Sequence, residues 1–180
     1  MARLLGISGS LRSGSFNTSL LRAASMLLPE GTTLDVATLH GIPLYDGDVE
    51  RQGIPAEVNA LKDRVVASEG VLLVTPEYNN SLPGVFKNAI DWLSRPPDDI
   101  GRVFRGRPFA LIGASPGGFG TILSQNAWLP TLRTLGAELW TGGRLMVSGA
   151  GKVFDEEGNL TDEVVRAKLA RFLDGFVASI

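Results

Sequence analysis

Short apolar runs alternate with helical segments along the chain, and this alternation is the feature that most restricts its fold. The run over residues 70–75 reads GVLLVT and is apolar on both faces, as in a strand that is buried on two sides. A parallel sheet covered by helices on both faces is the arrangement that buries such strands. The sequence therefore predicts an α/β fold. Five strands are expected, at residues 3–8, 32–38, 70–75, 108–113 and 138–147.

Five helices are expected between and after these strands. Ser81 and Thr161 are the expected N-caps of the third helix and the last. Pro130 should kink or break the fourth helix. Residues 41–53 are rich in Gly and Pro and predict a long surface loop. The helices are placed by helical spacing of apolar residues at 18–28, 55–68, 83–93, 121–135 and after Thr161.

Composition excludes several kinds of chemistry. The 180 residues include no cysteine and one histidine, which rules out disulfides and thiolate nucleophiles and argues against a histidine-built metal site. The net charge of -2 gives no field that would draw nucleic acid or an acidic membrane. The length suits a single domain over residues 1–180, and neither a secretory signal nor a bilayer-spanning run is visible. We therefore expect a soluble, cytoplasmic protein with no metal and no nucleic-acid or membrane partner.

The segment after the first strand predicts an anion site. Residues 9–18 read GSLRSGSFNT and lead into a helix, so free backbone N–H groups and the helix dipole face this loop. Arg12 and four hydroxyl side chains add donors, and residues 1–29 carry three Arg and no acidic residue. The glycine spacing is that of a P-loop, but Ser15 and Phe16 replace the Lys-Ser/Thr pair that triphosphate chemistry needs. A phosphate monoester fits better, and a turn that only caps the helix is the alternative.

Two further loops follow strands. Residues 75–84 (TPEYNNSLPG) offer an aromatic ring, two amides and two prolines, which suits a flat heteroaromatic ligand; an ordinary Asn/Pro turn is the alternative. Residues 113–120 (GASPGGFG) contain four glycines that allow a ligand to approach the backbone closely, with a flexible turn as the alternative. Residues 108–132 carry no charge, so this loop should face a neutral group. The uncharged helix around Trp128 should be fully buried or lie in a subunit interface.

All three loops follow strands of one parallel sheet, so they should meet beyond its carboxyl edge. Together they describe a nucleotide-like ligand with one phosphate and a large ring, and flavin mononucleotide (FMN) is such a molecule. In flavodoxin, whose strand order is 2-1-3-4-5, FMN lies at the switch in strand order.

Two motifs resemble the NAD(P)H-dependent FMN reductase family, which includes bacterial chromate/quinone reductases and azoreductases. They are GSLRSGSFN at residues 9–17 and PEYN at residues 76–79, the second followed by SLPG and KNAIDW. The likeness runs over most of the chain. It implies a flavodoxin-like three-layer sandwich, a five-stranded parallel sheet of order 2-1-3-4-5, bound FMN, and a homodimer or homotetramer.

The resemblance also implies the site residues. The FMN phosphate would be held by Ser10, Arg12, Ser15, Asn17 and Thr18. The ring system would meet Pro76, Glu77, Tyr78 and Asn79, chiefly through backbone groups, and the ring or ribityl region would meet Ser115, Gly117 and Gly118. No catalytic side chain is assigned, because flavin hydride chemistry requires no protein acid or base.

The resulting hypothesis is an NADPH- or NADH-dependent reductase. NAD(P)H and then a small acceptor, such as a quinone, a flavin, an azo dye or chromate, would use one place over the flavin in turn. A flavodoxin-type electron carrier is the alternative, although such carriers are usually far more acidic than -2. A non-flavin nucleotide-binding or regulatory protein is a third possibility. His40 and the acidic residues of the 46–50 loop are interpreted as surface groups, and Phe86 and Trp92 as core.

Overall fold

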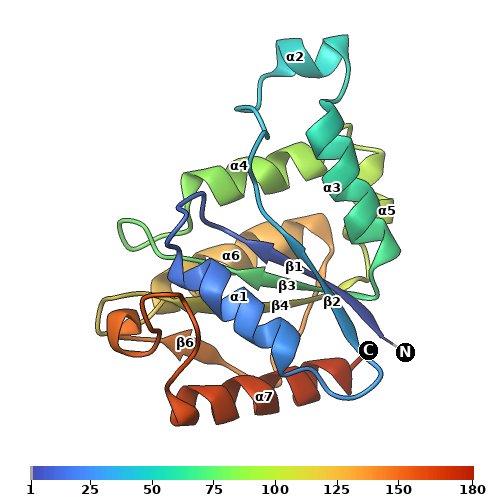
Figure 1. Cartoon of the computed structure of the whole chain (residues 1–180). Helices are drawn as coiled ribbons and strands as arrows, with labels where there is room; N and C mark the ends of the chain where they lie inside the picture. The colour runs from blue at the N-terminus through green and yellow to red at the C-terminus, as the bar shows by residue number, and fades with distance from the viewer. Residues whose placement is uncertain (1) are drawn as a thin grey trace.

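Six parallel strands form one sheet at the centre of the molecule (Figure 1). In the computed structural model, which describes residues 2–180, they run in the order β2-β1-β3-β4-β5, and β6 also pairs with β4. Every strand pairing is parallel. The flavodoxin-like class and the strand order are confirmed. The strands are β1 Arg3–Ser8, β2 Thr33–Ala37, β3 Gly70–Val74, β4 Pro108–Ala114, β5 Glu138–Leu139 and β6 Leu145–Val147.

Helices cover both faces of the sheet and complete three layers (Figure 1). Helices α1 and α7 lie on one face, and α3, α4, α5 and α6 pack on the other. Within residues 2–180, no helix combines the length and apolarity needed to cross a bilayer. The helices are α1 Phe16–Met26, α2 Gly47–Gln52, α3 Ala56–Ala67, α4 Gly84–Leu93, α5 Asp99–Val103, α6 Ile122–Leu135 and α7 Glu163–Val177, with a 3-10 turn at Ala150–Lys152.

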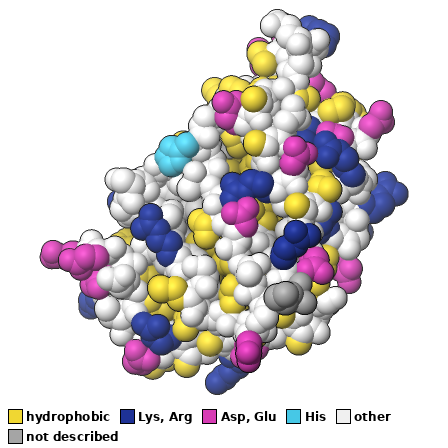
Figure 2. Space-filling view, turned by 45° about the vertical axis from the view of Figure 1, so that its right-hand side comes forward, with side chains coloured by type: hydrophobic (Ala, Val, Ile, Leu, Met, Phe, Trp, Pro, Cys, Tyr) yellow, Lys and Arg dark blue, Asp and Glu magenta, His cyan; other side chains and the backbone are white. Residues whose placement is uncertain are grey.

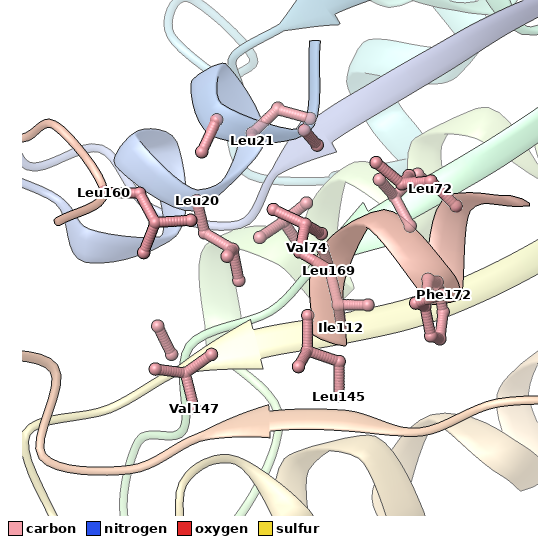
Figure 3. Packing of buried hydrophobic residues seen from close by; sticks show 14 of the residues in the cluster. Leu20, Leu21, Leu72, Val74, Ile112, Leu145, Val147, Leu160, Leu169 and Phe172 are labelled. Atoms are coloured by element: carbon pink, nitrogen blue, oxygen red, sulfur yellow. The ribbon is translucent and has the colours of Figure 1, made fainter. Parts of the chain in front are cut away.

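Strand β3 shows why the sheet needs both layers. All five of its residues are buried, and successive side chains point to opposite faces. Leu72 and Val74 pack with the cluster under α1 and α7 (Figure 3), whereas Val71 and Leu73 pack with the cluster under α3, α4 and α6. A strand with two apolar faces is stable only between two layers of helices.

The fifth predicted strand is interrupted at residues 140–144, although the Phe109 carbonyl oxygen of β4 still accepts the backbone N–H of Trp140 at 2.8 Å. Its indole packs edge-on against Phe172 of α7, with ring centroids 4.8 Å apart. A Cβ at Gly142 or Gly143 would lie 2.8 Å from that indole, so the backbone wraps closely around the ring. The expected strand at 138–147 is therefore two short strands, β5 and β6, that both pair with β4.

Two predicted caps are wrong. Ser81 does not cap α4: the cap position is Pro83, and Ser81 exchanges backbone hydrogen bonds with Tyr78 instead. At α7 the cap is Asp162, whose carboxylate accepts from the first-turn N–H groups, whereas the hydroxyl of Thr161 donates to a carbonyl oxygen in the preceding loop. Ser15 caps α1, which starts at residue 16 and not at residue 18.

Two short helices were not predicted. Helix α2 lies inside the expected 41–53 loop, because Asp46 caps it and Asp48 pairs with Arg51. Glu50 accepts a hydrogen bond of 2.7 Å from the Tyr45 hydroxyl, so these acidic groups serve local structure. Helix α5 is the second. Helix α6, in contrast, runs through Pro130 without ending there.

A buried ammonium group fastens α3 to α5. The Lys62 side chain has no exposed surface, and its Nζ donates to the Arg95 carbonyl and to Asp99 Oδ2, the latter at 2.8 Å. Asp99 also accepts two hydrogen bonds from Arg102, at 2.7 and 3.0 Å. The hydrogen bonds from Arg102, which have the larger effect, and from Lys62 lower the pKa of Asp99 to about 2.

We predict that Asp99→Ala lowers the free energy of unfolding by about 3 kcal/mol, because it leaves a buried ammonium without its carboxylate. Lys62→Met should cost about 1 kcal/mol or less, since it removes the buried charge itself. Urea denaturation of both variants measures the difference. Because the folded-state pKa is depressed, the contribution of Asp99 is complete above pH ~4 and fades as pH falls towards 2. A larger loss in Lys62→Met than in Asp99→Ala would contradict this assignment.

Candidate functional site

The three loops after β1, β3 and β4 meet at the carboxyl edge of the sheet, on the left of Figure 1. They enclose a small crevice of about 60 Å³. The crevice is lined by Ser10, Arg12, Ser15, Phe16, Asn17, Pro76, Glu77, Tyr78, Ala114, Ser115 and Pro116.

Most of the predicted site residues are brought together here. Eight of them line the crevice, whereas Thr18, Asn79, Gly117 and Gly118 are not among its lining residues. Phe16, Ala114 and Pro116 were missed, although each is a direct neighbour of a predicted residue in the same loop. Contact of any of these residues with FMN stays a prediction.

The loop at residues 9–18, which follows β1, presents hydrogen-bond donors in fixed positions. Ser10 and Ser15 are 3% and 4% exposed, and the hydroxyl oxygen of each accepts a backbone N–H, from Arg12 and Thr18 respectively, both at 3.3 Å. A hydroxyl that accepts in this way still has its own proton to donate. The guanidinium of Arg12 is exposed beside them, and the first turn of α1 adds N–H groups with no acceptor inside the helix. This donor set fits a phosphate monoester.

Asn17 ties the first loop to the third. Its Nδ2 donates to the carbonyl oxygen of Ala114 at 2.8 Å, and its Oδ1 accepts from the Ala114 N–H at 2.9 Å. Asn17 is 3% exposed, so the pair of bonds is shielded from water. One amide hydrogen and the backbone N–H remain for a ligand, and the first function of this side chain is to align the two loops.

The second loop turns back on itself at two asparagines. Asn79 and Asn80 have φ values of 50° and 60°, as both central residues of a type I′ turn require. Tyr78 and Ser81 close this turn with reciprocal backbone bonds of 3.0 and 3.1 Å. The Asn pair therefore builds a turn, which was the plainer of the two interpretations. The turn leaves the Tyr78 ring 42% exposed beside the crevice.

Two glycines permit the loops to pack so closely. A Cβ at Gly9 would lie 2.2 Å from the Phe86 ring and 2.9 Å from Pro76 Cδ, so this glycine brings the first loop against the second. A Cβ at Gly113 would lie 2.2 Å from the Thr75 carbonyl oxygen. Any side chain at either position would separate the loops that form the crevice.

A larger hollow of about 440 Å³ lies beside α6 and the edge of the sheet. Trp128 is completely buried, but Ile122, Leu123 and Leu129 are 45%, 42% and 42% exposed. Full burial of this uncharged helix within the chain is therefore wrong, and a subunit interface stays a prediction. We call this surface the α6 groove; its walls are Leu111, Ile122, Leu123, Gln125, Asn126, Leu129, Leu139, Trp140, Thr141, Gly143, Arg144 and Met146.

A doubly wound sheet with a hydroxyl-rich anion loop after its first strand defines a flavodoxin-like protein of the mononucleotide-binding type. Comparison with known proteins narrows this class. Residues 2–152 match the family model of NADPH-dependent FMN reductases. The chain therefore belongs to that family.

Curated and structural relatives agree with this family. An NAD(P)H-dependent FMN reductase of Pseudomonas aeruginosa is 44% identical over 91% of this chain and 87% of its own length. A 2-hydroxy-1,4-benzoquinone reductase of a Burkholderia species is 36% identical over 94% of this chain and 91% of its own. The solved structure of FerB, a flavoenzyme NAD(P)H:(acceptor) oxidoreductase from Paracoccus denitrificans, matches with a TM-score of 0.86 at 35% identity, covering 99% of this chain and 96% of that one.

The family decides between the interpretations that the sequence left open. The chain is an oxidoreductase that uses FMN with NAD(P)H, and the electron-carrier and non-flavin interpretations are set aside. The residues of the crevice fit this cofactor, because buried hydroxyls, an arginine and a helix N-terminus form one donor set for its phosphate.

We predict that Arg12→Ala weakens FMN binding about tenfold, the loss expected for one charge-assisted hydrogen bond at an exposed site. The measurement is a fluorescence titration of the apoprotein with FMN. Arg22→Ala is the matched control, because Arg22 is an exposed arginine near the other end of α1. Equal affinities for wild type and Arg12→Ala would remove Arg12 from the phosphate site.

Proposed function

We propose that this protein is a quinone reductase that takes electrons from NAD(P)H through FMN and transfers them to a flat, uncharged acceptor. The observation that carries the proposal is the uncharged side of the site: residues 108–132, which supply the third loop and α6 as far as Leu132, contain no charged residue. A charged acceptor would lose hydration there without gaining a partner. Support also comes from the curated relatives, of which one is named a 2-hydroxy-1,4-benzoquinone reductase.

We assign each part of the FMN molecule to one or more of the three loops. Ser10, Arg12 and Ser15 hold the phosphate, and the backbone of Pro76–Tyr78 forms the wall for the ring. Asn17, Thr18, Asn79, Ser115, Gly117 and Gly118 complete the proposed contacts. When bound, FMN supplies the hydride chemistry, accepting from NAD(P)H and passing reducing equivalents to the acceptor.

The protein itself binds the reactants and orients them. Exposed aromatic rings stand on two of the loops, Tyr78 at 42% and Phe119 at 85% exposure, where flat molecules can stack. Neither ring is a proton donor in this proposal. The one histidine, His40, is exposed and contacts Thr38 and the Leu11 carbonyl, both at 3.2 Å, so it supports the first loop and performs no acid–base step.

We predict that the purified holoprotein reduces 1,4-benzoquinone with at least about tenfold higher kcat/KM than chromate at a fixed NADPH concentration. The reason is the cost, above about 1.4 kcal/mol, of bringing a dianion to an uncharged wall. Steady-state oxidation of NADPH followed by absorbance gives both values, with free FMN as the background control. A kcat/KM for chromate that equals or exceeds that for the quinone would overturn the choice of acceptor.

We also propose that the whole chain acts as one FMN-binding domain and that a second copy covers the α6 groove. The argument for a homodimer is the apolar surface that α6 leaves exposed: Arg144 is the one charged residue among the walls of the groove, and interface cores are depleted of charge in the same way. A tetramer built from two such dimers is the larger assembly that the resemblance implied.

We predict that Leu129→Arg converts the protein to a monomer, because it places a charge among the apolar side chains of the α6 groove. Multi-angle light scattering after size exclusion measures the mass. Val164→Arg is the control: Val164 is 63% exposed on α7, on the opposite side of the sheet. If Leu129→Arg and wild type have the same mass, the second copy does not sit on this groove.

A further inference from the structure

Glu77 stands out in the crevice because it is the one acidic residue among those that line it in the described chain. Within residues 2–180, its carboxylate takes part in no salt bridge. Oε2 accepts the backbone N–H of Leu123 at 2.9 Å and that of Ser124 at 3.0 Å. These two N–H groups belong to the first turn of α6. A loop residue therefore caps a helix that starts more than 40 residues later.

Helix α6 needs this cap. Its own N-cap residue, Thr121, makes no side-chain capping bond, and its first turn contains no acidic residue. The N-terminal N–H groups of a helix lack partners within the helix and carry partial positive charge. A carboxylate that accepts from two of them is therefore in a favourable place.

A second contact lies two residues earlier in the same loop. Thr75 is completely buried, and its Oγ1 lies 2.8 Å from Ser124 Oγ and accepts from Trp128 Nε1 at 3.1 Å. Thr75 and Glu77 thus hold α6 at its first and second turns. Pro76 lies between them and lines the crevice, so its position is fixed from both sides.

We propose that Glu77 is the positioning residue of the flavin loop: its carboxylate holds the backbone of residues 76–78 against α6, and it forms no bond to the flavin. The proposal rests on the function proposed above, in that the backbone of these residues forms the wall for the ring. The proposal also gives the Glu77 carboxylate an electrostatic effect on the flavin. A negative charge at the rim of the crevice opposes the extra negative charge of reduced FMN, and the helix N-terminus reduces that opposition without abolishing it.

The test compares Glu77→Gln and Glu77→Ala with a matched control. Glu69 is suitable for the control, because it also accepts a backbone N–H, from Arg3 at 2.8 Å, but lies at the amino edge of the sheet, opposite the edge that carries the crevice. We expect Glu77→Ala to raise the FMN dissociation constant about tenfold. Glu77→Gln keeps an acceptor oxygen and should stay within about threefold of wild type. Glu69→Gln should match wild type.

The midpoint potential of bound FMN tests the proposed effect of the Glu77 charge, which a purely structural role of this side chain would not produce. Both Glu77 variants remove the same negative charge, so both should shift the potential to more positive values, whereas Glu69→Gln should leave it unchanged. If Glu77→Ala fails to fold, which far-UV circular dichroism shows, Glu77→Gln still carries the potential measurement.

Two outcomes overturn the proposal: an FMN affinity of Glu77→Ala equal to wild type, or an unchanged midpoint potential in Glu77→Gln. These results are independent of the acceptor. A wild-type protein that prefers chromate contradicts the proposed function and leaves the assignment of Glu77 standing, because that assignment is measured on FMN binding and potential.

Discussion

The burial of β3 on both faces is the constraint on which the rest of the structure depends. Its five residues are buried, so neither face of the central strand can carry polar chemistry. Polar groups can gather only where the strands end. The carboxyl ends of β1, β3 and β4 lie side by side, and each is followed by a loop that contributes to the crevice. The place of the site is thus a consequence of how the core is covered.

Contacts between loops convert this shared edge into a shaped site. Asn17 binds both backbone groups of Ala114, Gly9 admits close packing of the first loop on the second, and Glu77 fixes the second loop to α6. Each contact joins segments that are far apart in sequence. Together they hold the donors of the first loop and the backbone of the second in place before a ligand arrives, which lowers the ordering cost of binding.

Sequence reasoning worked where the physical signal was local. The GVLLVT run, the alternation of strands and helices, and the hydroxyl-rich loop each depend on neighbouring residues, and the fold class and the meeting of three loops followed from them. It failed where a partner lies far along the chain. Nothing near Trp140 reveals that its indole will pack on Phe172 of α7, and nothing near Glu77 reveals that its partners are the N–H groups of residues 123 and 124. The predicted caps Ser81 and Thr161 failed for a smaller reason: the turn at 78–81 and the carboxylate of Asp162 offered better geometry.

Helix α6 connects the two proposals made for this protein. Leu123 donates its N–H to Glu77, and its side chain, in a residue that is 42% exposed, lines the α6 groove. One residue therefore contacts both the flavin loop and the groove. A second copy seated on the groove would restrain the same turn of α6 that Glu77 restrains. Binding free energies at two sites that share an ordered element are linked, and the linkage is reciprocal. On this argument, whatever orders α6 from the groove also favours the flavin loop in its binding conformation, and FMN in the crevice favours the surface that the second copy would bind.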